Sequence, residues 1–212
     1  ARRRDMTLSK DEQLLNQTKC GIFAPGIEGK ILDCNDLDIE LSHNEKNIGE
    51  LVIKGPYITK KYYKINTPNK FTKDGYLITG DIAYINGNEQ MKIKDRSKDM
   101  IKSGGEWISS VDLENYISTL SEVEFACVVA AKHPKWIERP VCIIQLKPGK
   151  TLTKEKVLAW TRKKFAKFQT PDDVLFWDEI PMTGTGKLSK KDVRAKLEAI
   201  KYVLPSLKQS KL

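Results

Sequence analysis

One lysine in the last part of the sequence has a setting that suits a reactive or ligand-binding cation. Lys187 follows the turn-forming residues Thr183-Gly-Thr-Gly and precedes a predicted helix. Such a loop can be mobile and exposed, so that a long side chain enters a cleft and its ammonium stabilises developing negative charge. The alternative is a surface lysine that leads into a helix. A phosphate-binding P-loop is excluded, because the position five residues before Gly186 is Pro181 and not glycine.

Two further residues have side chains suited to a polar ligand. Asp81 closes the segment Gly75-Tyr-Leu-Ile-Thr-Gly-Asp81 at the end of a predicted strand. An ionised carboxylate there can accept hydrogen bonds from a pair of hydroxyl groups, although a solvent-facing turn residue is the alternative. Arg96 presents a rigid fork of donors suited to phosphate or ribose oxygens. Its alternative is a surface salt bridge to Asp95 or Asp99.

A glycine pair, Gly104-Gly105, follows these residues and allows close approach of the backbone to a ligand. The alternative is a plain turn before a helix. Lys98 and Lys102 lie just before the pair. Nothing in the local sequence distinguishes either of them from a solvated lysine.

The elements that must position these residues change in type along the chain. Residues 49–55 alternate as a half-buried strand does, and apolar runs flank Asn86-Gly87, a dipeptide typical of a tight hairpin. Residues 1–19 are predicted to be a loose or helical lead-in. Residues 35–47 are predicted to be a surface loop.

After Arg96 the pattern predicts helix, strand, strand, helix, strand and helix, which is a small α+β domain. The helix starts are expected at Ser109-Ser110, Thr153 and Ser189, and the strands at 125–131, 141–146 and 173–177. The apolar faces of the helices are predicted to be Leu113, Ile117 and Leu120; then Val157, Leu158, Phe165 and Phe168; then Val193, Leu197 and Ile200.

Composition narrows the classes of function. The 212 residues carry a net charge of +9, but the lysines are scattered and not interleaved with aromatic residues, so no nucleic-acid partner is predicted. An anionic small ligand or solvated lysine faces account for the charge. The four cysteines form no CxxC pair and there are two histidines, so no metal site is predicted. No transmembrane segment or signal peptide is found, and the scattered thiols indicate a reducing, cytoplasmic location.

Three segments, in this order, resemble motifs of the AMP-forming acyl-CoA synthetases, which belong to the adenylate-forming superfamily. Residues 75–81 are similar to the Thr-Gly-Asp motif of that family. Residues 94–108 resemble its hinge motif with the glycine turn that follows, and residues 181–187 resemble its lysine loop. The Ser-Gly-Gly-Glu-Trp-Ile-Ser-Ser stretch is similar to medium- and long-chain fatty-acyl-CoA ligases.

The resemblance implies that the complete protein converts a fatty acid, ATP and CoA into acyl-CoA, AMP and pyrophosphate through an acyl-adenylate. It implies ribose and phosphate contacts from Asp81 and Arg96, and it makes Lys187 the residue that drives adenylation. The remaining implied roles are a pivot at Lys98 and a part in thioester formation for Lys102, Gly104 and Gly105.

The resemblance also implies a domain organisation. Residues 1–95 would be the last β-rich subdomain of a large N-terminal domain, a distorted barrel. Residues 96–98 would be the hinge, and residues 99–212 a mobile α+β lid. The family's phosphate loop and its Mg²⁺-ligating Tyr-Gly-x-Thr-Glu segment are missing, so the Mg²⁺ that accompanies ATP would be held outside this chain.

We therefore expect the chain to be part of a larger protein and to be inactive alone. Three alternatives stay open. The chain could be a non-catalytic module that binds nucleotide or CoA, or part of an adenylation domain that loads a carrier protein. A basic nucleic-acid-binding protein is the third alternative, and only the net charge favours it.

Overall fold

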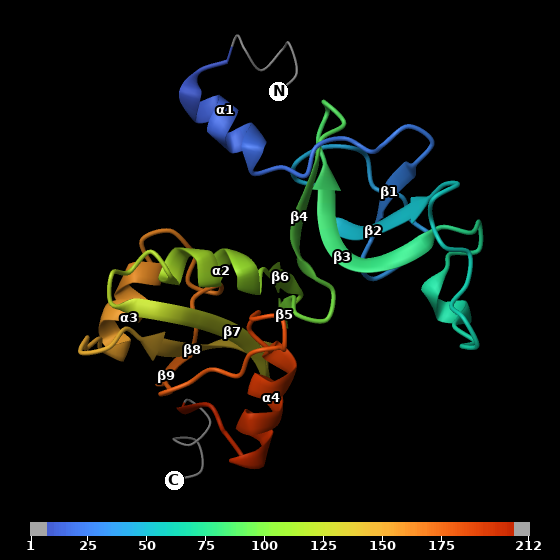
Figure 1. Cartoon of the computed structure of the whole chain (residues 1–212). Coiled ribbons are helices and arrows are strands. Elements are labelled where there is room, and N and C mark those ends of the chain that lie inside the picture. The colour runs from blue at the N-terminus through green and yellow to red at the C-terminus, as the bar shows by residue number, and fades with distance from the viewer. Residues whose placement is uncertain (1–7, 206–212) are drawn as a thin grey trace. The chain divides into compact units, whose positions relative to one another are not determined.

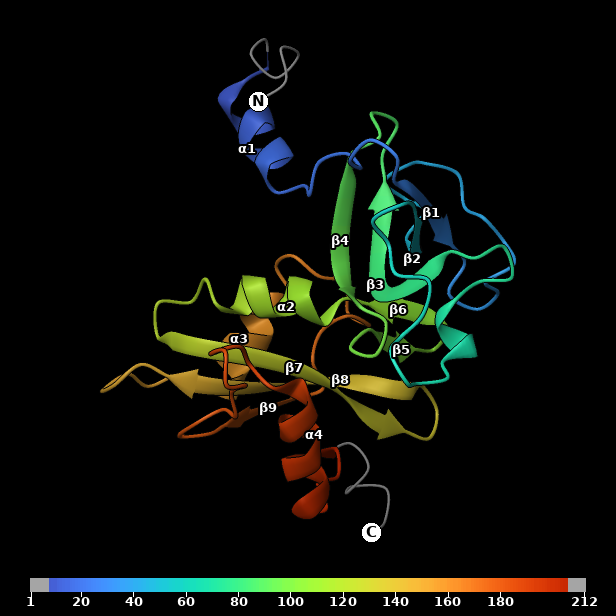
Figure 2. The same cartoon turned by 45° about the vertical axis from the view of Figure 1, so that its right-hand side comes forward.

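The computed structural model describes residues 8–205, and contacts divide the chain into unit 1, Ala1–Lys98, and unit 2, Asp99–Leu212. In unit 1 an antiparallel sheet runs in the order β1-β2-β3-β4 (Figures 1 and 2). The short helix α1 (Lys10–Gln17) precedes it, and a 3-10 turn, η2 (Pro68–Lys70), lies between β2 and β3. The strands are β1 (Glu28–Leu32), β2 (Gly49–Lys54), β3 (Leu77–Ile85) and β4 (Met91–Arg96).

The predicted β-rich character of unit 1 is confirmed, and so are the strand at 49–55 and the hairpin at Asn86-Gly87. Asn86 builds that turn, because its side-chain oxygen accepts the backbone N–H of Asn88 and of Gln90, each at 3.0 Å. The lead-in is helical at residues 10–17, while residues 1–7 lie outside the described part of the chain. Within residues 8–98 the sheet stays open and does not close into the expected barrel. β1 and β4 are the edge strands, and their outer sides meet short segments through the isolated bridges Leu32–Glu40 and Gly21–Met91, so closure needs more strands.

Unit 2 is an α+β domain, as the sequence predicts, but two short strands that were not predicted precede its first helix. Its central hairpin is β7 (Val123–His133) with β8 (Ile137–Leu146). On the other side of β8 lie β5 (Ile101–Ser103), hydrogen-bonded to β6 (Glu106–Ile108), and the parallel strand β9 (Asp173–Phe176). Three helices cover the sheet: α2 (Ser110–Ile117), α3 (Lys154–Thr161) and α4 (Lys190–Ala199).

Both faces of the β7–β8 hairpin are apolar, and each face carries its own core. Helices α2 and α3 cover one face and α4 covers the other (Figure 1). Alternate residues serve the two cores, as the two-residue repeat of a strand requires. The first core takes Ala126, Val128, Cys142 and Ile144, and the second takes Cys127, Val129, Val141 and Ile143.

The predicted helix starts are confirmed by their caps. The side chain of Ser109 accepts the backbone N–H of Asp112 at 3.1 Å. Thr153 caps α3 and Ser189 caps α4 through the equivalent backbone N–H three residues later, at 3.3 and 3.4 Å. Each cap satisfies a donor that the first turn of a helix leaves unpaired.

The predicted helix ends are wrong in each case. α2 ends at Ile117, and Leu120 is buried in the turn after it. α4 ends at Ala199, and the side chain of Ile200, the residue after it, is 59% exposed. The chain reverses at Lys201, whose φ is 50°, and Leu204 enters the core where Ile200 was expected.

The end of α3 also differs from the prediction. The helix stops at Thr161, so Phe165 and Phe168 follow it and do not share its face. Phe165 packs edge-on against Tyr116 with ring centroids 5.6 Å apart, whereas Phe168 stays exposed. The Phe168 carbonyl accepts a hydrogen bond from the guanidinium of Arg139, which is distant in sequence.

Burial of the thiols gives a first prediction. Cys127 and Cys142 are buried free thiols, and burial raises the pKa of Cys127 to about 12 and that of Cys142 well above its usual value. Because the thiolate is the reactive form, we expect an alkylating reagent at neutral pH to modify exposed Cys20 and to spare both buried residues until the chain unfolds. Mass spectrometry of the alkylated peptides checks this. Equal rates at Cys20 and Cys142 in the native chain would contradict it.

Candidate functional site

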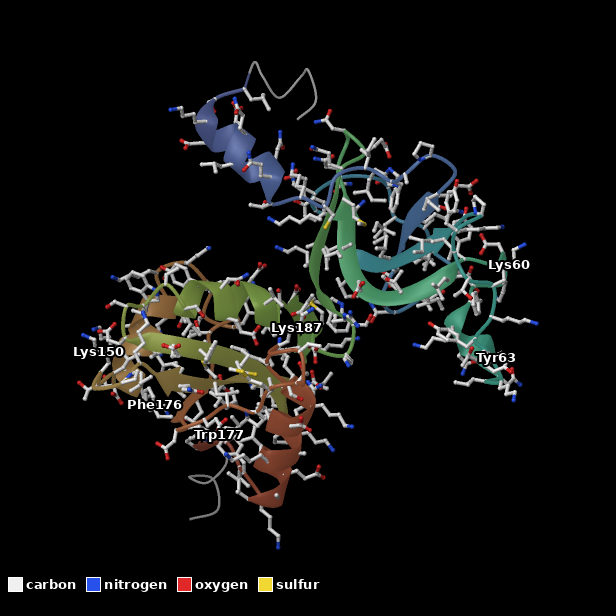
Figure 3. All side chains as sticks on the ribbon, in the orientation of Figure 1. Lys60, Tyr63, Lys150, Phe176, Trp177 and Lys187 are labelled. Carbon is white, nitrogen blue, oxygen red and sulfur yellow. The ribbon has the colours of Figure 1, made fainter. Side chains whose placement is uncertain are left out.

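Lys187 lies on a hydrogen-bonded turn that leads into α4 (Figure 3). The backbone N–H of Thr183 donates to the Lys187 carbonyl at 2.7 Å, and the Lys187 N–H donates to the Thr183 hydroxyl at 3.2 Å. Gly186 allows the turn with a φ of 75°. The Lys187 side chain is exposed, as predicted, and its ammonium has no partner within residues 8–205. The turn is thus a fixed support for a free cation.

Asp81 and Arg96 lie opposite each other on β3 and β4, both in unit 1. The Arg96 Nε and the Asp81 Oδ1 are 2.7 Å apart. A salt bridge was the alternative for Arg96, and one is present, but its partner is not Asp95 or Asp99. The Asp95 carboxylate accepts the backbone N–H of Arg96, and Asp99 pairs with Arg194. Asp81 and Arg96, the two residues predicted to bind a nucleotide, therefore form an ion pair with each other.

A bulge in β3 aims the Asp81 side chain. Glu50 pairs with Ile82 and Val52 with Ile78, so residues 79–81 lie opposite a single residue of β2. A bulge of this kind bends a strand and redirects its side chains. Gly80, with a φ of 76°, takes the conformation that an L-residue adopts only at a cost.

Glu50 is a site residue that the sequence reasoning missed. Its side chain is buried, at 6% exposure, and its Oε1 accepts the backbone N–H of Gly80 at 2.7 Å. Its Oε2 accepts the Ser97 hydroxyl. The available signal was a glutamate next to the apolar run Leu51-Val-Ile53 of a predicted strand, because a buried carboxylate requires hydrogen-bond donors. Glu50 ties the bulge before Asp81 to the end of β4.

Lys98 is exposed between two anchored residues. Ser97 is held to unit 1, because its backbone N–H donates to the Gly80 carbonyl at 3.0 Å and its hydroxyl donates to Glu50. Asp99 is held within unit 2 by Arg194 at 2.9 Å. Lys98, the predicted pivot, therefore lies between a residue held in unit 1 and a residue held in unit 2.

Unit 2 contains a cavity of about 750 Å³ beside Gly104. Two aromatic side chains, Trp136 and Phe168, lie in its wall together with the cations Arg162 and Lys167. All four are exposed, so they are free to meet a ligand. The sequence reasoning missed them, although the pairs Lys135-Trp136 and Lys167-Phe168 set a cation beside an aromatic residue. The remaining lining residues are Ser103, Gly104, Glu106, Arg139, Leu158, Thr170, Pro171 and Asp172.

Arg139 stabilises the wall of this cavity through hydrogen bonds to other lining residues. Its side chain is only 8% exposed, and its Nε and Nη2 donate to Asp172 Oδ1 at 2.9 and 2.6 Å. Nη1 donates to the Ser103 hydroxyl at 2.8 Å, and Nη2 to the Thr170 carbonyl at 3.1 Å. With the bond to the Phe168 carbonyl, the guanidinium joins β5, β8 and the segment before β9.

The predicted glycine turn joins β5 to β6. Gly104 and Gly105 have φ values of 61° and 95°, the combination that a two-residue hairpin turn needs. Trp136 lies against Gly104: its carbonyl accepts the Gly104 N–H at 2.9 Å, and a Cβ on Gly104 would lie 2.9 Å from the indole Cε3. Lys102, on β5, has its ammonium 5.1 Å from the ring centre of Trp107. The structure thus brings Lys102 and both glycines to one edge of the cavity-bearing sheet.

Within residues 8–205 there is no group of three or more histidine, cysteine or acidic side chains that could hold a metal ion. None of the helices in that part of the chain has the length and apolar character that crossing a membrane requires.

The family described as AMP-binding enzyme C-terminal domain matches residues 112–187. This part of the chain is similar to the C-terminal domain of AMP-binding enzymes. Lys187 is the last residue of the match, which includes most of α2 and all of α3 and the central hairpin.

Curated relatives of this chain are CoA ligases. It is 40% identical over 190 residues to a long-chain-fatty-acid–CoA ligase of Thermus thermophilus, covering 89% of this chain and 35% of the relative. A medium-chain-fatty-acid–CoA ligase of Ectopseudomonas oleovorans is 40% identical over 189 residues, with 89% and 34% covered. The chain therefore spans about a third of the length of these relatives. These relatives confirm the predicted resemblance.

Solved structures of adenylate-forming enzymes share the fold. ATP-bound MatB of Rhodopseudomonas palustris is 27% identical with a TM-score of 0.78, over 86% of this chain and 36% of that one. The o-succinylbenzoate CoA synthetase of Bacillus subtilis, in complex with its acyl-adenylate intermediate, is 25% identical with a TM-score of 0.76, over 88% and 37%.

Proposed function

We propose that this chain is the C-terminal part of an AMP-forming acyl-CoA synthetase. The complete protein would activate a medium- or long-chain fatty acid with ATP to an acyl-adenylate, then pass the acyl group to the CoA thiol. One observation carries the proposal. Unit 2 carries Lys187, a free cation on a hydrogen-bonded turn, which suits adenylation. It also has a separate cavity lined by aromatic and cationic side chains, which suits the binding of CoA for acyl transfer. The names of the curated relatives support it.

In the first half-reaction the carboxylate of the acid attacks the α-phosphorus of ATP and pyrophosphate leaves. Negative charge gathers on the carboxylate and α-phosphate oxygens, and the Lys187 ammonium stabilises it. The Asp81 carboxylate accepts the ribose hydroxyls, while Arg96 donates to ribose or phosphate oxygens. Binding of the nucleotide therefore exchanges the Asp81–Arg96 ion pair for contacts with ATP.

In the second half-reaction unit 2 turns about Lys98 as a mobile lid, with residues 96–98 as the hinge and residues 1–95 as part of the adenylation domain. The CoA thiol attacks the acyl carbonyl and AMP leaves. The Gly104-Gly105 turn lets the pantetheine arm approach the backbone, and Lys102 lies on the strand before it.

The cavity beside Gly104 receives the nucleotide part of CoA in this proposal. The rings of Trp136 and Phe168 can stack on adenine. Stacking of a base on an aromatic side chain contributes about 1–3 kcal/mol. Arg162 and Lys167 supply positive charge for the phosphates. Both kinds of group are exposed on one wall, which is the chemistry of a nucleotide site.

The Mg²⁺ that accompanies ATP is usually held by one or two carboxylates together with the phosphates and waters. We place its ligands in the rest of the protein. We also propose a cytoplasmic location, which the four free thiols support.

Replacement of Gly104 by alanine tests the second half-reaction. The new Cβ would push Trp136 out of place, so we expect transfer of the acyl group to CoA to fall about tenfold or more, while pyrophosphate exchange is kept. Gly87→Ala is the control, since a Cβ at that hairpin glycine meets nothing within 4 Å. Rates of the two half-reactions, measured separately, check this. An equal loss in both would refute the role of the turn.

The proposed function is tested with the complete protein and a panel of short-, medium- and long-chain acids. Acid-dependent exchange of pyrophosphate into ATP and formation of a CoA thioester are the expected results. A complete protein that performs neither would reject the proposal. Exchange without thioester, together with acylation of a carrier protein, would favour an adenylation domain. We expect residues 1–212 alone to give no turnover.

A further inference from the structure

We infer that α4 is a strut that joins the exit of the hinge, at Asp99, to the turn that carries Lys187. The inference rests on the proposed role of Lys187 in adenylation. It assigns Arg194 and Lys190 as positioning residues, which act on the reaction through the placement of Lys187 and not by touching substrate.

The first end of the strut is the pair Arg194–Asp99. The Arg194 Nη1 donates to Asp99 Oδ1 at 2.9 Å across 95 residues of sequence. Asp99 is the first residue of unit 2, directly after the predicted pivot Lys98, and its side chain is largely buried. Any movement that starts at Lys98 therefore reaches α4 through this ion pair.

The second end is the first turn of α4. The Lys190 ammonium lies 2.9 Å from Glu114 Oε1 and donates to the Ser110 hydroxyl at 2.5 Å. The same Glu114 oxygen accepts the backbone N–H of Val128 at 2.7 Å. Since Lys190 and Glu114 are both largely buried, α4 is fixed by this contact to α2 and β7 at the point where the Lys187 turn enters it.

The helix between these ends is rigid and well packed. Lys190 and Arg194 are four residues apart and so lie on the same side of α4. Val193 and Leu197 are buried in the core under it. At the N-terminus the Ser189 N–H donates to the Pro181 carbonyl at 2.8 Å, which closes the turn onto the helix. Lys187, α4 and Asp99 thus form one body.

A rigid connection has a functional consequence. If rotation at the hinge is to bring Lys187 to the reacting phosphate, the distance from Asp99 to Lys187 must not vary. A catalytic group misplaced by about 1 Å can cost on the order of 100-fold in rate. Loss of the strut is therefore expected to impair adenylation more than the transfer step, in which Lys187 has no role.

The test uses the complete protein with Arg194→Met, Arg194→Lys and the exchange pair Asp99→Arg with Arg194→Asp. We expect Arg194→Met to lower kcat of acid-dependent pyrophosphate exchange about 10- to 100-fold with KM for ATP unchanged. Acyl transfer from preformed adenylate should persist, and Arg194→Lys should keep most of the exchange activity. Lys191→Met is the matched control, because Lys191 is exposed on the same helix and makes no ion pair in the described chain.

A second measurement separates the strut from the proposed function. Hydrogen exchange at the amides of Thr183, Gly186 and Lys187, which are bonded in the turn, should accelerate in Arg194→Met and not in Lys191→Met. Unchanged exchange at these amides would overturn the strut, as would an equal loss of both half-reactions or failure of the exchange pair to restore activity. A wild-type protein without adenylation would reject the proposed function, while hydrogen exchange would still decide the strut.

Discussion

Replacing Lys187 by alanine in the complete protein is expected to lower acid-dependent pyrophosphate exchange by about 10²- to 10³-fold. The side chain is exposed, its ammonium has no partner within residues 8–205, and its backbone is fixed by Thr183. Removal of the ammonium therefore withdraws charge stabilisation without disturbing the fold. Transfer of the acyl group from preformed acyl-adenylate to CoA should stay unchanged, and the two rates are measured separately.

Lys191→Ala is the control for this experiment. Lys191 is also exposed and lies just inside α4, so it repeats the loss of one positive charge close to the turn. We expect it to keep both half-reactions. Unchanged pyrophosphate exchange in Lys187→Ala would show that the assignment of this residue is wrong.

Replacing Arg139 by methionine is expected to lower the free energy of unfolding by about 3–5 kcal/mol, the usual cost of removing one member of a buried ion pair. The change leaves Asp172 without its partner and the carbonyls of Phe168 and Thr170 without a donor. Urea unfolding followed by circular dichroism measures this.

Arg162→Met is the matched control for Arg139→Met. Both arginines line the cavity, but Arg162 is exposed and has no ion pair among residues 8–205. Its loss should change the free energy of unfolding by no more than about 0.5 kcal/mol, as for most surface substitutions. It should weaken CoA binding if the cavity takes the nucleotide part of CoA. Equal stability of the two variants would contradict the supporting role of Arg139.

Local patterns were enough to predict most elements of this chain. Ser109, Thr153 and Ser189 each begin a helix, because a capping side chain and the first turn are neighbours in sequence. The Asn86-Gly87 hairpin is local for the same reason. The candidate residues on turns and strand ends, such as Lys187 and Asp81, were found because short motifs keep them together.

The features that the sequence did not reveal depend on distant partners. In the segment after α3, the Phe168 carbonyl accepts a hydrogen bond from Arg139, 29 residues earlier in the sequence, and no local propensity reports this contact. Strand pairing brings Trp136 beside Gly104, and the hydrogen bond from Arg139 to the Phe168 carbonyl holds Phe168 in the same cavity wall. The partner of Arg96 was missed because the register of β3 and β4, and not sequence proximity, sets Asp81 opposite it. The roles of the cavity wall and of Arg96 in the reaction remain predictions.

The two-sided core of the β7–β8 hairpin has a consequence for folding. In a sheet with one solvent-exposed face, a one-residue shift in the pairing register of a strand is unfavourable, because it would move apolar side chains into water. Here both faces are apolar, so that penalty is weak. Selection of the native pairing then depends on the reversal at residues 134–136, where the His133 ring accepts the N–H groups of Lys135 and Trp136 at 3.1 and 3.2 Å. Ile137, with a φ of 70°, completes the reversal. The few residues that carry Trp136 to the cavity therefore also decide which of two similar pairings the chain adopts as it folds.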